Sequence, residues 1–432
     1  MIVWHLRPKM ERRFRAGHPW VFSNELAESP KGIEPGSEIE LREASGKFIA
    51  RGYGNAFSLI AFRTVTRESE ESDALQFTGI FRRLKRASEF RYALGFVRQS
   101  HRLCFGEADA LPGLIVDRYF LSPNGKQQVF VIQMQTAGID YRREIVLKAI
   151  EALVTEEQNV WGYPSFQDTA IIIRNDVSAR KLDGINEEEP RTIKEIPGVS
   201  LSDSSILVRS AWSEEPLAFS VNLFGGQKTG FFLDQAINTR LAVERLKWPI
   251  QTLAKKEVRI LDLCSYVGQW STQLSGALRS IKIESKVTAV DASASALDFA
   301  RRNVESVGAE FIGLKGDVLR DLGSVSETFD IVVSDPPALI KSRKEIPQGT
   351  HAYVQINTQA LRLLSRGGCI ISSSCSGLLS ETEFAGVLAK AANRQMRKVK
   401  WIARGGQSPD HPILAEFPEG KHLKTWIGIV DV

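Results

Sequence analysis

The C-terminal half of the chain constrains the fold most, because short apolar runs alternate there with helical patterns. Residues 257–265, EVRILDLCS, predict a strand that is apolar on both faces, and residues 295–308, SALDFARRNVESVG, predict an amphipathic helix that ends at a glycine. Strands buried on both faces are typical of parallel sheets. Alternating strands and helices predict a doubly wound α/β sheet, which binds ligands at the carboxyl ends of its strands.

This alternation continues to the end of the chain and predicts a Rossmann-like, seven-stranded domain over 206–432. The helix over 351–368 is expected to close at the glycine pair 367–368. The last strand is expected to be antiparallel. The predicted strands cover 257–265, 286–293, 311–318, 329–337, 369–376, 396–404 and 422–431.

The first half predicts a different architecture. Residues 36–55 alternate apolar and polar residues, with turns expected at Gly52 and Gly54, so that 1–72 is predicted to form a small β-barrel. Residues 73–205 combine a basic helix with strands and predict a central α+β domain. A length of 432 residues is also typical of two or three domains.

Positive charge is concentrated near the N-terminus. The net charge is +5, and residues 1–102 hold 18 Lys and Arg against 12 Asp and Glu. The excess is densest over 81–102, FRRLKRASEFRYALGFVRQSHR, which is expected to be either a solvated amphipathic helix or a phosphate-contacting surface for RNA. A small β-barrel with surplus arginine also favours an RNA-binding module.

The cysteine and hydropathy patterns argue against several classes of protein. The four cysteines form no C-x-x-C pair and no metal-ligand spacing, which predicts free thiols in a reducing cytoplasm and no metal. The N-terminus lacks the apolar core of a signal peptide, and no run of about 18 apolar residues could span a membrane. We expect a cytoplasmic protein with RNA as its partner, in which an edge strand could support a homodimer.

A polar residue follows each of the five predicted parallel strands. One acidic residue at a strand end usually caps a helix or a turn, but four in order are hard to assign to capping alone. They predict a single ligand site at the carboxyl edge of the sheet, formed by Asp262 with Gly268, Asp291, Asp317, Asp335 and Cys375.

The first of these loops, 262–270, DLCSYVGQW, indicates which ligand binds. A dinucleotide needs a G-x-G-x-x-G loop for its pyrophosphate, whereas this loop has one glycine and begins with an acidic residue. An aspartate would repel phosphate but suits the ammonium and sulfonium groups of S-adenosylmethionine (SAM). Asp291 would then bind the ribose hydroxyls, and Asp317 would lie near the adenine.

Two further motifs indicate chemistry on a nucleobase. In 334–338, SDPPA, the prolines either end a strand or place Asp335 and the Pro336 carbonyl against a planar base, as in methylation of nitrogen or of carbon. A partly exposed Cys375 could add to carbon 6 of cytosine and so make carbon 5 nucleophilic. A lone cysteine is more often an inert core residue, which better describes Cys104, Cys264 and Cys369.

Several segments follow one another in the order of a known family: GHPWVFSNEL, LPGLIVDRY, QKTGFFLDQ, LDLCSYVG, DPPA, SSSCSGL and DHPILAEFPEG. Through them the chain resembles the bacterial large-subunit ribosomal RNA cytosine-5 methyltransferases that carry an N-terminal PUA domain. The resemblance covers nearly the whole chain and is densest from residue 107 onward. The CSGL stretch separates this group from its sister family that methylates guanine.

The resemblance implies a PUA domain, a central α/β domain and a C-terminal SAM domain, with Cys375 as the covalent nucleophile and 23S ribosomal RNA as the substrate. The chain departs from the family pattern at Ala236, Gln269 and Ala338, where arginine, glycine and lysine are usual. The implied cofactor contacts are Lys228, Phe232 and Gln235 over the cofactor, Asp262, Cys264 and Gly268 at its methionine end, Asp291 at the ribose and Asp317 at the adenine.

We therefore expect a SAM-dependent RNA methyltransferase that forms 5-methylcytosine. Two alternatives stay open at this point. One is an RNA base N-methyltransferase that uses the Asp335 motif, in which Cys375 is structural. The other is a non-catalytic RNA-binding assembly factor, which only Gln269 and Ala338 favour.

Overall fold

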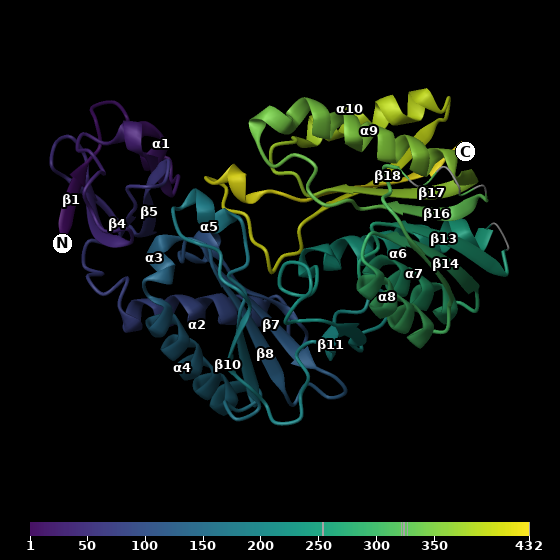
Figure 1. Ribbon diagram of the computed structural model, residues 1–432, viewed down its shortest axis with the longest axis horizontal. Coiled ribbons are helices and arrows are strands. Elements are labelled where there is room, and N and C mark those ends of the chain that lie inside the picture. The colour runs from purple at the N-terminus through teal and green to yellow at the C-terminus, as the bar shows by residue number, and fades with distance from the viewer. Residues whose placement is uncertain (253–254, 321, 323–324, 326, 432) are drawn as a thin grey trace. The chain divides into compact units, whose positions relative to one another are not determined.

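The chain divides into two compact units, which are described one at a time. The computed structural model describes residues 1–252, 255–320, 322, 325 and 327–431, and of 247–252 it describes the backbone. The division into 1–72, 73–205 and 206–432 stays a prediction. The first unit contains Met1–Val208, Asn222–Phe231 and Asp410–Gly420, and the second contains Arg209–Val221, Phe232–Pro409 and Lys421–Val432 (Figure 1).

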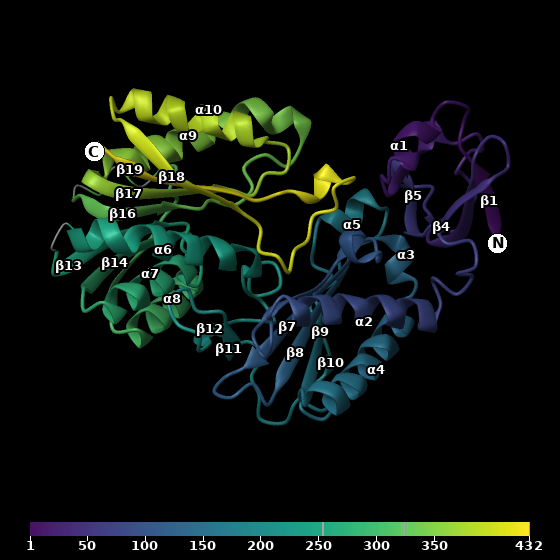
Figure 2. The same cartoon turned by 180° about the vertical axis from the view of Figure 1, so that it is seen from behind.

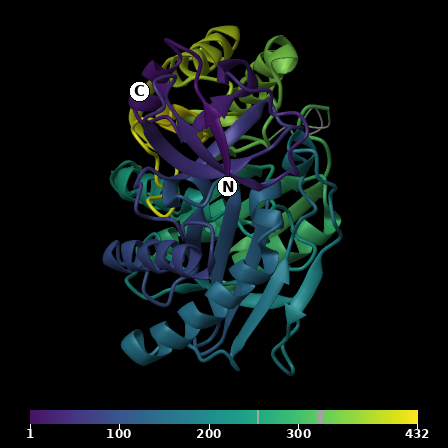
Figure 3. The same cartoon turned by 90° about the vertical axis from the view of Figure 1, so that its left-hand side faces the viewer.

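The first unit begins with a five-stranded sheet, which faces the viewer in Figure 3. Its strand order is β1-β3-β4-β5-β2, with β1 parallel to β3 and the other pairs antiparallel. Trp4, Phe14, Ile39 and Phe62 belong to its buried core. The elements are β1 Ile2–His5, α1 Glu11–Arg15, β2 Trp20–Phe22, β3 Ser37–Arg42, β4 Phe48–Gly54 and β5 Ile60–Thr66.

The turns predicted at Gly52 and Gly54 are wrong, because both residues lie inside β4. A Cβ atom at Gly52 would lie 1.9 Å from the carbonyl oxygen of Arg63, on the paired strand β5. A Cβ atom at Gly54 would lie 2.7 Å from the ring of Trp4. The glycines are needed for close packing within the sheet rather than for a change of chain direction.

The other strands of the first unit belong to a second sheet, in which they follow one another in the order β10-β9-β8-β7-β11, with β6 also paired to β7. Helices α2 and α4 pack together on its apolar core. The elements are α2 Phe77–Ala93, β6 His101–Phe105, β7 Leu114–Leu121, β8 Gln128–Met134, α3 Ala137–Asp140, α4 Arg143–Trp161, β9 Thr169–Ile173, α5 Ala179–Leu182, β10 Arg191–Lys194 and β11 Ser204–Val208.

The basic run 81–102 is not one solvated helix. Helix α2 ends at Ala93, and the last residues of the run begin β6. Arg83 and Arg91 are buried, where they pair with Glu71 and with Asp109. Much of the positive charge therefore holds the first unit together and is not available to a phosphate backbone.

The second unit contains the predicted seven-stranded sheet (Figure 1, Figure 2). Its order is β15-β14-β13-β16-β17-β19-β18, and β19 is antiparallel to β17, as predicted. Helices α6, α7 and α8 contribute to the core on one face, and α9 and α10 to the core on the other. The strands are β12 Leu217–Val221, which precedes the sheet, β13 Glu257–Leu263, β14 Glu284–Asp291, β15 Glu310–Lys315, β16 Phe329–Ser334, β17 Leu364–Ser374, β18 Val399–Gly406 and β19 Lys424–Val430.

The helices predicted over 295–308 and 351–368 form as α8 and α9, but α9 begins and ends earlier than predicted, and the helix α6 was not predicted. Helix α9 ends at Arg362, and β17 begins at Leu364, before the predicted glycine stop. A Cβ atom at Gly368 would lie 3.0 Å from the carbonyl oxygen of Asp330, so glycine allows the close approach of β17 to β16. The helices are α6 Ala236–Thr252, α7 Gln269–Ser280, α8 Ala294–Ser306, α9 Ile346–Arg362 and α10 Glu381–Arg394.

Short 3₁₀ turns complete the described elements: Ser23–Glu25, Gly106–Asp109, Leu233–Gln235, Arg343–Glu345 and Pro418–Gly420. None of the helices in the described part of the chain is long and apolar enough to span a bilayer.

Candidate active site

The carboxyl ends of the parallel strands meet at one edge of the seven-stranded sheet. Strands β13, β14, β16 and β17 are parallel neighbours, with Leu263 opposite Ser334 and Ser334 opposite Ser372. Asp335 follows the end of β16, and Cys375 follows the end of β17. The register therefore brings these two predicted residues to the same edge, close to the loop after β13.

The loop after β13 has an unusual backbone. Cys264, Tyr266 and Gly268 have positive φ angles of 63°, 48° and 76°. The Cys264 N–H donates to the Val290 carbonyl at 2.9 Å, and the Tyr266 N–H donates to Asp291 Oδ2 at 2.8 Å. Such conformations are costly for residues other than glycine and are concentrated at ligand sites.

Two positions fix the turn from this loop into α7. Gly268 precedes the helix, and a Cβ atom there would lie 3.1 Å from the Cβ of Ala300 on α8. Gln269, which stands where the related family has a second glycine, is the first residue of α7 and is 7% exposed. The Gln269 side chain is therefore buried at the start of α7, so this position accepts a side chain larger than that of glycine.

Asp262 lies under this loop and is fully buried. Its Oδ2 accepts hydrogen bonds from the Ser271 hydroxyl at 2.5 Å and from the Ser271 N–H at 3.3 Å. Its Oδ1 has no hydrogen-bond partner among the described residues. Burial raises the pKa of Asp262 to about 7, because desolvation disfavours the carboxylate.

The carboxyl groups of this edge suit a cationic ligand without phosphate. Asp291 is 7% exposed, and its two oxygens accept hydrogen bonds from the Tyr266 and Ser293 N–H groups at 2.8 and 2.9 Å. Each oxygen keeps a second lone pair that a ribose hydroxyl could use. Asp317 is exposed, and its Oδ1 accepts from the Leu319 N–H at 2.9 Å. Oδ1 of Asp262, which has no partner among the described residues, and the carboxylates of Asp291 and Asp317 suit the positively charged groups and the hydroxyls of SAM.

Asp335 is the centre of a polar group. Its Oδ2 accepts hydrogen bonds from Gln235 Nε2 at 2.7 Å and from Trp270 Nε1 at 3.0 Å. Gln235 Oε1 in turn accepts from the Asn238 side chain at 2.6 Å. The structure thus brings the predicted Gln235 and Asp335 into direct contact.

Phe232 also lies in the second unit. Its ring packs edge to face on Tyr266, in the loop after β13, with ring centroids 5.3 Å apart and an interplanar angle of 89°. Lys228 belongs to the first unit and is exposed. Its predicted place over the cofactor therefore stays a prediction.

Cys375 is half-buried, and its thiol donates to the Pro336 carbonyl with an Sγ–O distance of 3.8 Å. The other three thiols lie in the cores or in the loop after β13. Cys104 and Cys369 are fully enclosed in the cores, and Cys264 is half-buried. Burial raises the pKa of all three thiols, which keeps them protonated and weakly nucleophilic.

Several residues at this edge were not found from the sequence. Trp270 lies two positions after the loop glycine, and its indole N–H binds Asp335. Lys424 begins β19 opposite Ser374, so the antiparallel register of the last strand could have indicated it. The buried Tyr353 on α9 contacts Ser376, beside Cys375, and nothing in its local pattern marks it.

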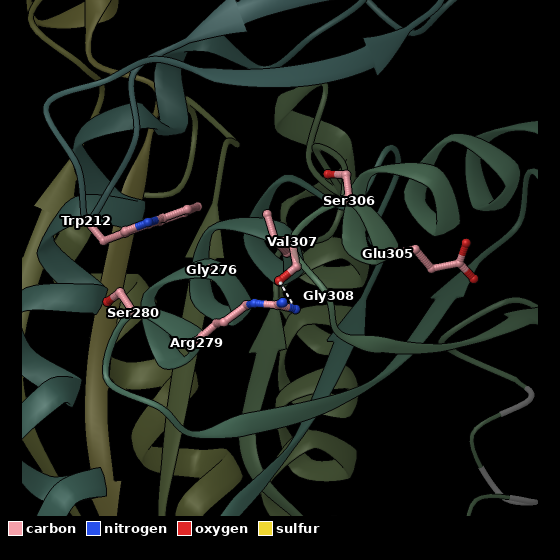
Figure 4. Close-up of a pocket in the computed structure, with 8 residues that line it drawn as sticks. All are labelled: Trp212, Gly276, Arg279, Ser280, Glu305, Ser306, Val307 and Gly308. Carbon is pink, nitrogen blue, oxygen red and sulfur yellow. Dashed lines mark hydrogen bonds between the residues drawn. The ribbon is translucent and has the colours of Figure 1, made fainter.

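Other features of the second unit lie away from this edge. A hollow of about 480 Å³ is formed where α7 and α8 end, which is at the amino ends of the strands (Figure 4). In it Arg279 donates to the Val307 carbonyl at 3.3 Å.

Among the residues that the structure describes, no cluster of three or more His, Cys, Asp or Glu side chains could hold a metal ion.

Comparisons with known proteins support the same interpretation of both units. A PUA-like domain matches residues 5–67, and a methyltransferase small domain matches residues 237–393. A solved structure from Streptococcus mutans, described as a candidate SAM-dependent methyltransferase, is similar over 99% of this chain and 100% of that chain, with a TM-score of 0.74 and 16% identity. A second solved structure with the same TM-score of 0.74 is a complex with SAH.

Curated relatives match over almost the whole chain. A ribosomal RNA large subunit methyltransferase I from Klebsiella pneumoniae subsp. pneumoniae is 33% identical over 425 residues, which is 96% of this chain and 94% of that protein. Another from Cronobacter sakazakii is 32% identical over 425 residues, or 96% of each chain.

The fold, the strand-end site and these comparisons define a class I SAM-dependent methyltransferase, and therefore an enzyme with SAM as its cofactor. Within that class, the chain belongs to the ribosomal RNA large subunit methyltransferase I family. A non-catalytic assembly factor is thereby set aside. Gln269 and Ala338 are variations within an enzyme family.

Proposed function

We propose that this enzyme methylates carbon 5 of a cytosine in large-subunit ribosomal RNA, and that Cys375 is the nucleophile. The printed names of the relatives support ribosomal RNA as the substrate class. The PUA-like domain over residues 5–67 supports a separate RNA-binding surface.

The observation that carries the choice of target atom is the position of Cys375. Its sulfur is 3.8 Å from the carbonyl oxygen of Pro336, beside Asp335, at the edge where the cofactor residues gather. A half-buried thiol in this place can approach the face of a base that Asp335 and Pro336 hold by its polar edge. A cysteine with a purely structural role has no need of that position.

In the proposed reaction the Cys375 thiolate adds to carbon 6 of the cytosine and forms a carbon–sulfur bond. The pair of electrons displaced from the 5,6 double bond makes carbon 5 nucleophilic. Bound SAM supplies the electrophilic methyl group. Loss of the carbon 5 proton to a base and cleavage of the carbon–sulfur bond then release the methylated base and restore the thiolate.

The residues proposed to hold SAM are those already described at this edge, with Lys228 added from the family resemblance. Asp262 and the 264–268 loop would hold the methionine end, and Phe232 and Gln235 would lie over the cofactor. Asp291 would bind the ribose, and the exposed Asp317 would accept from the adenine amino group.

Methylation of a base nitrogen through Asp335 is the second candidate. It is favoured by the Asp335 carboxylate, which could accept a hydrogen bond from an exocyclic amine in addition to those from Gln235 and Trp270. That chemistry leaves Cys375 without a role in the reaction.

Nucleoside mass spectrometry separates the two candidates. The enzyme is incubated with SAM and with large-subunit ribosomal RNA from cells that lack its gene, and the RNA is digested to nucleosides. We expect 5-methylcytidine as the product, and none with Cys375→Ala. An N-methylated nucleoside that forms equally well with Cys375→Ala would contradict the proposal and favour the second candidate.

A further inference from the structure

A buried lysine is bonded to the loop that carries the proposed nucleophile. Lys424 begins β19, is 3% exposed, and pairs in register with Ser374, the residue before Cys375. Its Nζ donates hydrogen bonds to the carbonyl oxygens of Ser376 at 2.7 Å and Leu379 at 2.6 Å. The lysine therefore holds the loop that carries Cys375 from both sides of the thiol.

Lys424 differs from an ordinary structural lysine in how its charge is compensated. Its neighbour Lys421 forms an ion pair with Glu381 at 2.9 Å, whereas Lys424 forms none with any carboxylate in the described part of the chain. A buried cation without a carboxylate partner is costly. Such a cost is typical of a functional site, where the charge acts on a reacting group.

Two other elements hold the residue after Cys375. The hydroxyl of Ser376 accepts a hydrogen bond from the Ile340 N–H at 3.1 Å, in the loop after β16. The same hydroxyl lies 2.9 Å from the Tyr353 hydroxyl on α9. Together with Lys424 on β19, these contacts fix the backbone around Cys375 from three separate parts of the unit.

We propose that Lys424 is a positioning residue for Cys375: it fixes the loop after β17, and its ammonium charge stabilises the thiolate that attacks the base. This inference rests on the proposed function of Cys375. The lysine keeps its protons throughout, so no co-reactant is needed. The negative charge on sulfur is favoured before attack and after elimination, when the carbon–sulfur bond has broken.

The electrostatic environment of Lys424 agrees with this role. Burial lowers the pKa of Lys424 to about 8, while the nearby Cys375 acts in the opposite direction and raises it. The other charged groups that act on it are Lys421, which lowers the pKa, and Glu381 and Glu383, which raise it. The interaction between the two charges is mutual. If the Cys375 thiolate stabilises the ammonium form of Lys424, then the ammonium group stabilises the thiolate by the same amount.

The test is the pH dependence of Cys375 alkylation in the full-length protein. Iodoacetamide reacts with the thiolate, and mass spectrometry of the peptide that contains Cys375 gives the rate at each pH. We expect Lys424→Met to raise the midpoint of the profile by about one pH unit. Lys424→Arg should restore most of the shift, and Lys421→Met, which removes an exposed charge from the same segment, should leave the midpoint unchanged.

The outcomes are distinguishable from failure of the proposed function. An unchanged midpoint in folded Lys424→Met, with Cys375 still required for methylation, overturns this inference alone. A shifted midpoint together with an active Cys375→Ala variant overturns the proposed function instead. Should Lys424→Met fail to fold, the unmodified enzyme decides: a Cys375 midpoint at the value of about 8.5 for a free cysteine contradicts the inference.

Discussion

Buried charges are compensated differently in the two units of this enzyme. In the first unit, the buried guanidinium groups of Arg83 and Arg91 pair with Glu71 and Asp109. These pairs lie within helix α2 and its neighbours, far along the chain from any residue predicted to bind the cofactor. Paired charges of this kind stabilise a fold only while both partners are present.

At the carboxyl ends of the strands in the second unit, two buried charged groups lack such an ion-pair partner among the described residues. Asp262 keeps one carboxylate oxygen without a partner among the described residues, and Lys424 is bonded only to carbonyl oxygens there. Asp262 is bonded through its other oxygen to Ser271, and neither group forms an ion pair with a side chain in the described part of the chain. The comparison indicates that the first unit uses buried charge for structure, whereas the second uses it for a ligand and a nucleophile.

The largest effect should come from the nucleophile. We expect Cys375→Ala to lower the methylation rate on the order of a thousandfold or more, because no other group can form the bond to carbon 6. Cys369→Ala is the matched control, since Cys369 lies in β17, which ends one residue before Cys375, but is enclosed in the core. It should lower the free energy of unfolding by about 1 kcal/mol and leave the rate nearly unchanged. Rates are measured by transfer of labelled methyl groups to RNA.

The next effect should be on stability in the first unit. Arg91→Met leaves Asp109 buried without its partner, and we expect the free energy of unfolding to fall by about 3–5 kcal/mol. Arg86→Met is the control, because Arg86 is an exposed residue of the same helix and should change stability by less than about 0.5 kcal/mol. Urea unfolding measures both. Equal effects of the two substitutions would contradict the structural role of the buried pair.

A smaller effect concerns Asp262 and the cofactor. Between pH 3.8 and about 7 the folded protein holds a proton on Asp262 that the unfolded chain has released, so stability without SAM should fall as pH rises through this window. Binding of cationic SAM favours the carboxylate and should release about one proton per Asp262 at pH 6. Asp262→Asn should abolish that release and weaken SAM binding about tenfold. Calorimetry in two buffers of different ionisation enthalpy measures both quantities.

An unaltered proton release in Asp262→Asn would show that another group takes up the charge of the cofactor. The unpaired oxygen of Asp262 would then be a feature of the fold, and the contrast between the two units would lose one of its two examples.

The smallest expected effect is at Trp270. Trp270→Phe keeps an aromatic ring but removes the hydrogen bond to Asp335, while the bond from Gln235 remains. We expect a loss of about fivefold in kcat/KM for RNA, which corresponds to about 1 kcal/mol for one such bond. Steady-state kinetics measures it. A loss as large as that from Cys375→Ala would mean that Asp335 has more than a positioning role.

The seven strands and the acidic strand ends could be predicted because they depend on local patterns. Apolar runs of strand length and the prolines after Asp335 mark the ends of β13 and β16 directly in the sequence. The register of a parallel sheet then brings those ends together, which is how Cys375 and Asp335 could be assigned to one site in advance.

The parts that escaped prediction depend on contacts between distant segments. The glycines of β4 are required by the neighbouring strand, so their local pattern wrongly predicted turns. Lys424 acts through the carbonyls of a loop some 45 residues earlier, and the segment Asp410–Gly420 joins the first unit although it lies between two strands of the second. Periodicity carries no information about such long-range contacts.

The most direct test of the account is to map the covalent bond itself. The enzyme is incubated with SAM and with ribosomal RNA containing 5-fluorocytosine, whose fluorine cannot be removed as the proton is, so that the adduct persists. After digestion with protease and nuclease, tandem mass spectrometry should find the nucleotide attached to the peptide that contains Cys375, at the sulfur. Recovery of the fluorinated RNA without any adduct, from an enzyme that methylates the same RNA carrying ordinary cytosine, would contradict it, as would an adduct on any other residue.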